Sequence, residues 1–289
     1  KIIAGIIAKR VRKKVGVTMG YKQNGFREGR STIDATIAQK LIAESRRARG
    51  LETHFVYLDL HKAFDAIPRE ILYETLKAEG LPEKLMKLIK STHTNNKVRV
   101  KWGDKLANET EISTGVRQGC KAAPILFITF IEEAIRAALE DAPKGVKMNS
   151  KAGSSVLQDC SYDAEMWINA ILFADDVLLI GSTQQEAQEL LNKVTEQFAK
   201  RGLILNQKKT EYQIVNRAGD QKKEIMGGAE KIEEKWKVKH LGTIKTADLN
   251  DWEDVKHQTA KAHGVLKEGM RKIWRNKKLK REIKVKIFL

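Results

Sequence analysis

The sequence predicts an α+β protein in which an antiparallel sheet is backed by helices, and three observations support this fold class. Segments with apolar residues three or four positions apart alternate along the chain with short runs rich in β-branched and aromatic residues, as expected for amphipathic helices and strands. Glycines and prolines stand at the ends of most of these segments. A hairpin expected at residues 170–180 joins two strands directly, which makes their pairing antiparallel.

The composition indicates a protein that binds a polyanion. The 289 residues carry a formal net charge of +17, and the length fits one large domain or two modest ones. Residues 1–50 hold 13 Lys and Arg against 3 Asp and Glu, and residues 267–289 hold 10 against 2, so the middle of the chain is about neutral. Two basic ends on a neutral body favour nucleic acid, with solvated basic helices or an anionic membrane surface as the alternatives.

The sequence contains no apolar run of about eighteen residues, so no membrane-spanning helix is expected. Its two cysteines, Cys120 and Cys160, stand outside any CxxC pair. They predict free thiols in a reducing compartment, and they exclude a disulfide framework or a cysteine zinc site in this stretch.

The first fifty residues predict two helices with a basic loop between them. The first helix is expected over residues 1–15. In the segment QNGFREGRST (23–32), Arg27 and Arg30 stand among glycines, which suits contact with phosphate but also fits a simple basic loop. Ser31 and Asp34 form a capping-box pattern for the second helix, which is expected to end near Arg49. Apolar stripes with a spacing of four are formed by Ile3, Ile7, Val11 and Val15 in the first helix and by Ile33, Ile37 and Leu41 in the second.

Residues 55–60 (FVYLDL) predict an apolar strand that contains one acid, Asp59. An acid in a buried strand is costly unless it is paired or bound to a metal, so Asp59 is a candidate functional residue, whereas Asp65 is expected to be structural. A helix is predicted over residues 68–80 and another from Pro82, and a half-exposed hairpin is expected over residues 97–113. The inward side of the helix that begins at Pro82 is expected to hold Leu85, Leu88 and Ile89.

The middle of the chain contains two further candidate segments. The loop TGVRQGCKAAP (114–124) enters a helix expected to run from Pro124 to Leu139, and such a glycine-bearing loop can present backbone amides to a nucleotide. Residues 140–165 are weakly patterned and predict a loop or an irregular hairpin. The stretch AILFADDVLLI (170–180) predicts a hairpin with its turn at residues 174–177. Its acids, Asp175 and Asp176, fit a simple turn or a functional pair whose repulsion requires a cation.

The remainder of the chain predicts one long helix, several short strands and a basic helical end. The helix is expected over residues 183–201, with Ala187, Leu190, Leu191, Val194 and Phe198 facing inward. Residues 203–215 predict a strand, a turn and a second strand. Gly227 and Gly228 indicate a further turn, residues 236–244 predict a strand or hairpin, and residues 251–289 are helical and increasingly basic.

Asp59, Asp175 and Asp176 are far apart in the sequence, but one antiparallel sheet can place their strands side by side. Three converging carboxylates need divalent cations, and oxygen ligands point to Mg²⁺ or Mn²⁺. Two such ions about 4 Å apart stabilise the attacking and leaving oxygens of a phosphoryl displacement. Together with the basic ends of the chain, this chemistry suggests nucleotidyl transfer on nucleic acid.

Six segments, in this order, resemble motifs of the reverse transcriptase domain of non-LTR (LINE-like) retrotransposons. They are GFREGRST (25–32), YLDLHKAFDAIPRE (57–70), TGVRQGC (114–120), FADD (173–176), GLILNQKKTE (202–211) and KHLGTI (239–244). The resemblance implies a polymerase palm of the right-hand type, with partial fingers at residues 1–54 and most of the thumb missing. The palm would span residues 55–250, with residues 81–113 as a helix-and-hairpin insertion, and residues 251–289 would lead toward the thumb.

The resemblance also implies roles for individual residues. Asp59, Asp175 and Asp176 would be catalytic and would bind the metal ions, with the carbonyl of Leu60 as a further ligand. The nucleotide would contact Phe64, which selects against a ribose 2′-hydroxyl, and also Gln118, Gly119 and Lys209. Template and primer would contact Arg27, Arg30, Arg117, Leu241 and Gly242. For Phe64 a core aromatic, and for Lys209 a solvated turn residue, are the structural alternatives.

The chain departs from the family pattern after TGVRQGC, where Lys121, Ala122 and Ala123 replace the usual Leu-Ser-Pro-like triplet. An upstream fingers hairpin, an endonuclease and a zinc knuckle are also not found, so a core cut from a longer polyprotein is expected.

The predicted function is RNA-directed DNA synthesis. Its partners would be an RNA template, a DNA primer or nicked target DNA, and deoxynucleoside triphosphates, without a membrane. The protein would act inside the cell, and in the nucleus for a eukaryotic element. A group II intron-type reverse transcriptase and an inactive, domesticated palm that only binds RNA remain as alternatives, and the oligomeric state is left open.

Overall fold

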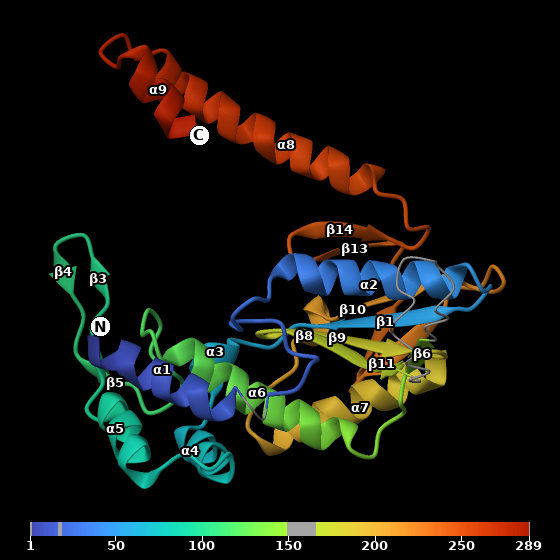
Figure 1. The fold of residues 1–289 in the computed structure, drawn as a ribbon, viewed down its shortest axis with the longest axis horizontal. Coiled ribbons are helices and arrows are strands. Elements are labelled where there is room, and N and C mark those ends of the chain that lie inside the picture. Colours follow the sequence, from blue (N-terminus) through green and yellow to red (C-terminus); the bar gives the residue numbers. More distant parts are fainter. Residues whose placement is uncertain (1, 17–18, 149–165, 289) are drawn as a thin grey trace, which may run out of the picture. The chain divides into compact units, whose positions relative to one another are not determined.

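The structure is a computed structural model that describes residues 2–16, 19–148 and 166–288 (Figure 1). The chain divides into two compact units, one ending at Lys235 and the other beginning at Trp236. They are called unit 1 and unit 2 below. The segment predicted as a loop over residues 149–165, which includes Cys160, lies outside the described residues.

Unit 1 is organised around a four-stranded sheet with the order β10-β1-β9-β8. These strands are β1 (Thr53–Leu58), β8 (Ala170–Phe173), β9 (Asp176–Gly181) and β10 (Glu211–Val215). Every neighbouring pair is antiparallel. All six residues of β1 are buried, so the strand that leads to Asp59 is the central, most protected part of the sheet.

Helices cover both faces of this sheet (Figure 1). On one face, α2 (Thr32–Arg47) packs against β1 and β8; on the other, α7 (Gln184–Lys200) packs against β1 and β9. A second layer consists of α6 (Ala123–Leu139), which packs on α7, together with α1 (Ile2–Val15) and α4 (Arg69–Ala78), which pack on α6. The short α3 (Ala63–Ala66) and α5 (Glu83–His93) complete the helices of unit 1.

Short antiparallel ladders extend from this body. β2 (Lys97–Val98) pairs with β5 (Thr110–Glu111), and β3 (Lys101–Trp102) pairs with β4 (Lys105–Leu106). β6 (Val146–Met148) pairs with β7 (Met166–Ile168), and β11 (Glu224–Gly227) pairs with β12 (Glu230–Glu233). A 3₁₀ turn, η1 (Gln207–Lys209), precedes β10.

Unit 2 begins with a hairpin of β13 (Lys237–His240) and β14 (Thr243–Thr246). A long helix, α8 (Trp252–Gly269), contacts β14 and continues into the π-helical turn η2 (Met270–Trp274). The chain ends in α9 (Arg281–Phe288). None of the α8 residues is buried. In the described ranges of both units, no helix has the length and apolar character needed to cross a bilayer.

Many of the predicted elements are confirmed. Ser31 and Asp34 form the expected capping box at the start of α2. The helix expected after Pro124 is α6, which begins one residue earlier. The five residues expected on the inner side of α7 are all buried.

Several details of the structure differ from what the sequence pattern suggests. The apolar stripe of α2 faces solvent, because Ile33, Ile37 and Leu41 are 65%, 51% and 57% exposed, and the helix instead buries Ala35, Gln39, Ile42, Ala43 and Arg46. Strand β1 begins and ends two residues earlier than expected. Leu88 is 38% exposed because Met86 takes the inward position on α5. The four strands of the 97–111 hairpin are exposed on both sides instead of half-buried.

Candidate active site

The three candidate carboxylates lie at one end of the central sheet. Asp59 follows Leu58, the last residue of β1, and Leu58 pairs with Val177 of the neighbouring strand β9. Asp176 precedes Val177, so Asp59 and Asp176 lie one residue beyond the same cross-strand pair. The β8–β9 turn contains only Ala174 and Asp175, because Phe173 already pairs with Asp176. The turn is therefore shorter than the four residues predicted.

Electrostatics show that these carboxylates share one environment. Burial, and secondly the charge of Asp59, raises the pKa of Asp175. Burial, followed by the charges of Asp175 and Asp59, raises the pKa of Asp176 to about 6. A cation near Asp59 is Lys209, whose Nζ lies 3.8 Å from the Oδ2 atom of Asp59. Both side chains are open to solvent, at 68% and 38% exposure, so screening makes this ion pair weak.

The side chains of Asp59, Asp175 and Asp176 have the chemistry to bind a hard divalent cation, but they do not form a preassembled metal site. Within the described ranges, no three His, Cys, Asp or Glu side chains stand close enough together to make a ready metal site. The donors are nevertheless all carboxylate oxygens, which Mg²⁺ and Mn²⁺ prefer. A divalent cation would also offset the burial and, secondly, the mutual repulsion that raise the pKa of Asp175 and Asp176.

The turn that carries Asp175 rests on the segment 22–25. Gln23 forms a parallel bridge with Leu172 of β8, and the flanking backbone donates in both directions: Leu172 N–H to Lys22 O at 2.9 Å, and Asn24 N–H to Leu172 O at 2.8 Å. The Gln23 side chain is fully buried. Its Oε1 accepts from the N–H of Gly25 at 2.7 Å and from the N–H of Ala174 at 3.1 Å. One amide oxygen thus ties this segment to the turn that carries Asp175.

Ala174 needs such support because its φ is +58°, a left-handed conformation that costs energy for a residue with a side chain. Gly25 lies directly against it: a Cβ atom at Gly25 would stand 2.2 Å from the Ala174 nitrogen. The sequence indicated only a basic loop here, and Gln23 was not singled out. Its role depends on a contact across 151 residues, which no local pattern reveals.

Replacing Gln23 with Met should lower kcat for primer extension while leaving the KM for the nucleotide nearly unchanged. Met has a similar length but no acceptor, so two buried N–H groups lose their partner at a cost of about 1–3 kcal/mol each. The Nε2 atom has no hydrogen-bond partner among the described residues, so its loss costs little.

Gln39→Met is the matched control, because Gln39 is also buried and donates to Tyr57 away from the turn. Steady-state kinetics and thermal melts separate the two variants. Both variants should have a lower melting temperature than the native chain. An equal fall in kcat for both would show that Gln23 affects only stability.

The loop 114–119 docks on α3, which follows Asp59. The Thr114 hydroxyl donates to Asp65 O at 3.0 Å, and the Gln118 Nε2 donates to the Asp65 carboxylate at 3.3 Å. Gly115 has a φ of +73°, and a Cβ there would lie 2.7 Å from the Asp65 Cα. Asp65, expected to be structural, therefore orients the candidate nucleotide residue Gln118.

Phe64 is partly buried, and its ring stacks on Phe127 of α6 at 4.0 Å between centroids and 6° between planes. The Phe64 carbonyl also accepts from Val116 N–H at 2.9 Å. The ring is therefore held against α6, and the backbone of residue 64 is held by the 114–119 loop.

The other predicted site residues differ in how they are held. Arg27 donates from Nη1 to the carbonyls of Gly20 and Gln23, so it also braces its own loop, whereas Arg30 and Arg117 are exposed. Gly119 has a φ of +77°. Leu60 is buried and bridges to Leu205. Leu241 and Gly242 form the β13–β14 turn in unit 2, so they are described only within that unit.

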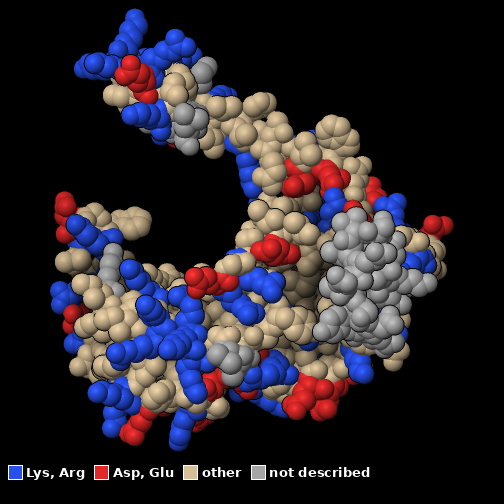
Figure 2. Space-filling view, in the orientation of Figure 1, with Lys and Arg blue, Asp and Glu red and all other residues tan. Residues whose placement is uncertain are grey.

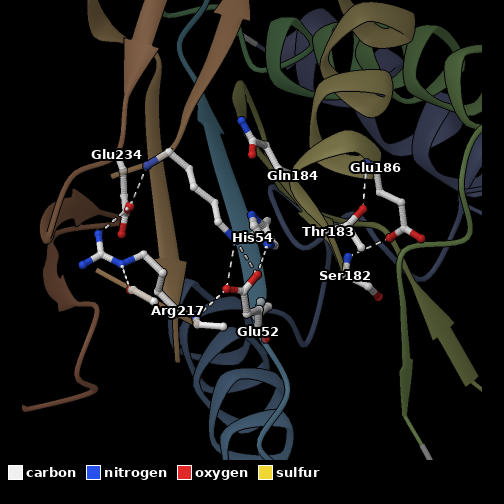
Figure 3. Close-up of polar contacts among 12 residues, drawn as sticks. Glu52, His54, Ser182, Thr183, Gln184, Glu186, Arg217 and Glu234 are labelled. Carbon is white, nitrogen blue, oxygen red and sulfur yellow. Dashed lines mark hydrogen bonds and ion pairs between the residues drawn. The ribbon is translucent and has the colours of Figure 1, made fainter. Parts of the chain in front are cut away.

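A different cluster of charges occupies the opposite end of β1 (Figure 3). Glu52 accepts from Lys223 Nζ at 2.9 Å, from Ala218 N–H at 2.6 Å and is 3.1 Å from His54 Nε2. Burial alone would raise the pKa of Glu52, but these hydrogen bonds lower it to about 2. His54 Nδ1 also lies 2.6 Å from the hydroxyl of Tyr212. At this end of the sheet, hydrogen bonds and a lysine compensate the charge of Glu52. At the other end, Asp59, Asp175 and Asp176 repel one another.

Solved structures identify the class of fold. The chain is similar to telomerase from Candida albicans in complex with a TWJ fragment of telomeric RNA, with a TM-score of 0.55 and 12% identity over 86% of this chain and 37% of that chain. An apo telomerase from Candida tropicalis gives a TM-score of 0.54 at 12% identity, over 86% of this chain and 40% of that chain. This likeness shows the right-hand polymerase fold and confirms the predicted fold class.

The sequence then identifies the family. Residues 1–244 match the family described as "Reverse transcriptase (RNA-dependent DNA polymerase)", and the chain belongs to that family. Curated relatives include the Pol polyprotein of the type-1 retrotransposable element R2 of Popillia japonica, 27% identical over 57% of this chain and 25% of the relative. The Pol polyprotein of the type-2 retrotransposable element R2DM of Drosophila melanogaster is 26% identical over 64% of this chain and 16% of the relative.

The chain thus spans a quarter or less of the length of these two relatives. The matches confirm the resemblance to a non-LTR retrotransposon reverse transcriptase domain.

Proposed function

We propose that this chain synthesises DNA on an RNA template as the polymerase core of an R2-type non-LTR retrotransposon. The observation that carries the proposal is the meeting of β1 with the β8–β9 hairpin, which brings Asp59, Asp175 and Asp176 to one end of a sheet. The family match and the R2 relatives support the reaction class, and they favour an R2-type enzyme over a group II intron-type enzyme.

Asp59 and Asp175 would hold Mg²⁺ or Mn²⁺, with Asp176 and the Leu60 carbonyl completing the ligand set. When bound, these ions supply charge stabilisation for the attacking and leaving oxygens of nucleotidyl transfer. Lys209, whose Nζ lies 3.8 Å from Asp59, would offset charge on the departing pyrophosphate. Its ammonium can also donate a proton there.

The remaining site residues would position the substrates. Gln118, oriented by Asp65, and Gly119 would lie against the incoming deoxynucleotide. Arg27, Arg30 and Arg117 would contact the template backbone, and the Leu241–Gly242 turn would contact the DNA primer or the nicked target. Residues 1–54 would then be partial fingers, 55–250 the palm with its 81–113 insertion, and 251–289 the path toward the thumb. For a eukaryotic element, the site of action would be the nucleus.

A primer-extension assay tests this function. The chain is given an RNA template, an annealed DNA primer, deoxynucleotides and Mg²⁺, and template-dependent lengthening of the primer is expected. Salt-sensitive RNA binding without extension in either Mg²⁺ or Mn²⁺ would instead establish the alternative of an RNA-binding palm without catalytic activity.

Replacing Phe64 with Ala should raise ribonucleotide incorporation relative to deoxynucleotide incorporation by roughly tenfold or more, because a steric block to the 2′-hydroxyl is removed. The ring is held by Phe127, so a rigid block is expected in the native chain. Phe64→Tyr keeps the ring and should keep the selectivity. The ratio of kcat/KM values for a ribonucleotide and its deoxynucleotide is the measurement, and an unchanged ratio in Phe64→Ala would place the discrimination elsewhere.

A further inference from the structure

A pocket of about 560 Å³ lies on unit 1, between the start of α1, the end of α5 and the loop that follows Gly115. Its lining includes two cations, Arg117 and Lys121, and the polar side chains of Ser91, Thr92, Asn96 and Gln118. Among the described residues that line it, none is acidic. Figure 2 shows Lys and Arg side chains gathered over the neighbouring α1 and α5, which carry eight of them: Lys9, Arg10, Arg12, Lys13, Lys14, Lys84, Lys87 and Lys90. The pocket therefore suits a polar, anionic ligand.

A two-stranded ribbon, β2 to β5, rises from the rim of this pocket. Ile112 N–H donates to Asn96 O at 2.8 Å, which closes the base of the ribbon at a pocket residue. Trp102, next to the tip, is 85% exposed, and Val100 beside it is 64% exposed. Trp102 pairs with Lys105, so the indole and an ammonium group project from the same side of the ribbon.

The charges of the ribbon are divided along its length. Near the base, Glu109 is held by Lys97 at 3.2 Å and by Arg99 at 3.4 Å. At the tip, Lys105 lies across the ribbon from Trp102, whereas Lys101 projects from the other side. Asp104 is the acid of the turn, and no ion pair of either lysine is found among the described residues. The tip thus combines an aromatic face with positive charge.

We propose that the pocket and the ribbon form one entry surface for a single-stranded nucleic acid, with a base stacked on Trp102 and phosphates on Lys105, Arg117 and Lys121. An exposed indole with an ammonium group directly across the ribbon matches single-strand binding, in which bases stack on aromatic side chains and cations follow the backbone. The identification of this nucleic acid as the incoming RNA template rests on the proposed function. The binding of a single-stranded nucleic acid to this surface does not depend on the proposed function.

A protein partner or a second copy of the chain would be held differently. Such an interface needs a contiguous apolar centre with few charges, whereas the apolar row of Val98, Val100 and Trp102 is one residue wide and lies beside Thr110 and Lys105 of the returning strand. The acid-free pocket at the base of the ribbon adds further positive charge. Charge complementarity therefore favours a polyanion.

The test measures the affinity of the full chain for a fluorescein-labelled oligoadenylate RNA, by anisotropy and without metal or nucleotides. Trp102→Ala should weaken binding by roughly 5- to 150-fold, the range for loss of one stacked base, and Trp102→Phe should restore most of it. Leu106→Ala is the matched control, because Leu106 is also exposed, at 61%, and pairs with Lys101 on the other side of the same ribbon. Its affinity should stay within about twofold of the native chain.

The dependence of affinity on salt tests the cations separately. Lys105→Ala should reduce the salt slope by about 0.7, and the double variant Arg117→Ala/Lys121→Ala should reduce it by about 1.4, since a single strand contributes about 0.7 per phosphate contact. Trp102→Ala should leave the slope unchanged, because stacking releases no counterions.

Native affinity in Trp102→Ala, or an unchanged salt slope in both Lys105→Ala and Arg117→Ala/Lys121→Ala, would overturn the proposal. A concentration-dependent dimer that Trp102→Ala abolishes, with RNA affinity unaltered, would overturn it in favour of a second copy. Failure of primer extension is a distinct result: a chain that does not extend but loses RNA affinity through Trp102→Ala contradicts the proposed function and leaves this surface supported.

Discussion

Replacing Asp175 with Asn should lower the rate of primer extension by about a thousandfold or more, because the stabilisation that metal ions give a transition state is worth several kcal/mol. The same change should raise the thermal stability of the chain. Burial and the charge of Asp59 already raise the pKa of Asp175, which means that its ionised form is held at a cost in the folded state. A neutral amide of the same shape removes that cost.

The pKa of Asp176 gives a second readout of the same variant. Its value of about 6 lies above that of an unfolded chain, so Asp176 destabilises the fold at neutral pH and this penalty is relieved as the pH falls through 6. With Asp175 neutralised, one of the two repelling charges is gone, and the Asp176 pKa should fall. Carboxyl NMR titration measures this shift, and Mn²⁺ titration measures the accompanying loss of metal affinity.

Asp141→Asn, at an exposed position on the loop after α6, serves as the control and should change none of these quantities. Extension at the native rate by Asp175→Asn would refute the carboxylate cluster as the catalytic centre.

Gly25→Ala should reduce extension at least tenfold and lower the melting temperature, because the added Cβ would stand 2.2 Å from the backbone nitrogen of Ala174. That neighbour is backbone, so relief requires movement of the turn that carries Asp175. Displacements of about 1 Å in a catalytic group can cost on the order of 100-fold in rate.

The control for this variant is Gly264→Ala, in α8, where a Cβ meets no atom within 4 Å. Helix propensity favours Ala there by about 1 kcal/mol, so its melting temperature should not fall. Extension assays and thermal melts on both variants are sufficient. Native activity in Gly25→Ala would show that the turn tolerates movement of the 22–25 segment.

Local pattern was enough to predict the helices and strands that carry their own boundary signals. The capping box at Ser31, the proline at the start of α6 and the apolar spacing of α7 act within a few residues, so the sequence displays them directly. The pairing of β1 with β9 could also be expected, because only a sheet that joins them brings the three acids together.

Contacts between distant segments could not be predicted in this way. The bond from Ala174 to Gln23 spans 151 residues, and that from Gln118 to Asp65 spans 53; in each case the residue gains its role from a partner that no periodicity indicates. The side of α2 that packs on the sheet could not be predicted for a related reason. Its apolar spacing is helical, but the sheet accepts the side with small residues, Ala35 and Ala43, which allow a close approach.

The outward stripe of α2 also affects how the protein behaves at high concentration. Ile33, Ile37 and Leu41, each more than half exposed, form a continuous apolar row of the kind that promotes aggregation. Side chains that remain this accessible add little burial energy to the fold. Lysine or glutamate at position 37 should therefore improve solubility and crystallisation at almost no cost in stability, while the opposite side of the helix, with buried Gln39 and Arg46, should tolerate no such change.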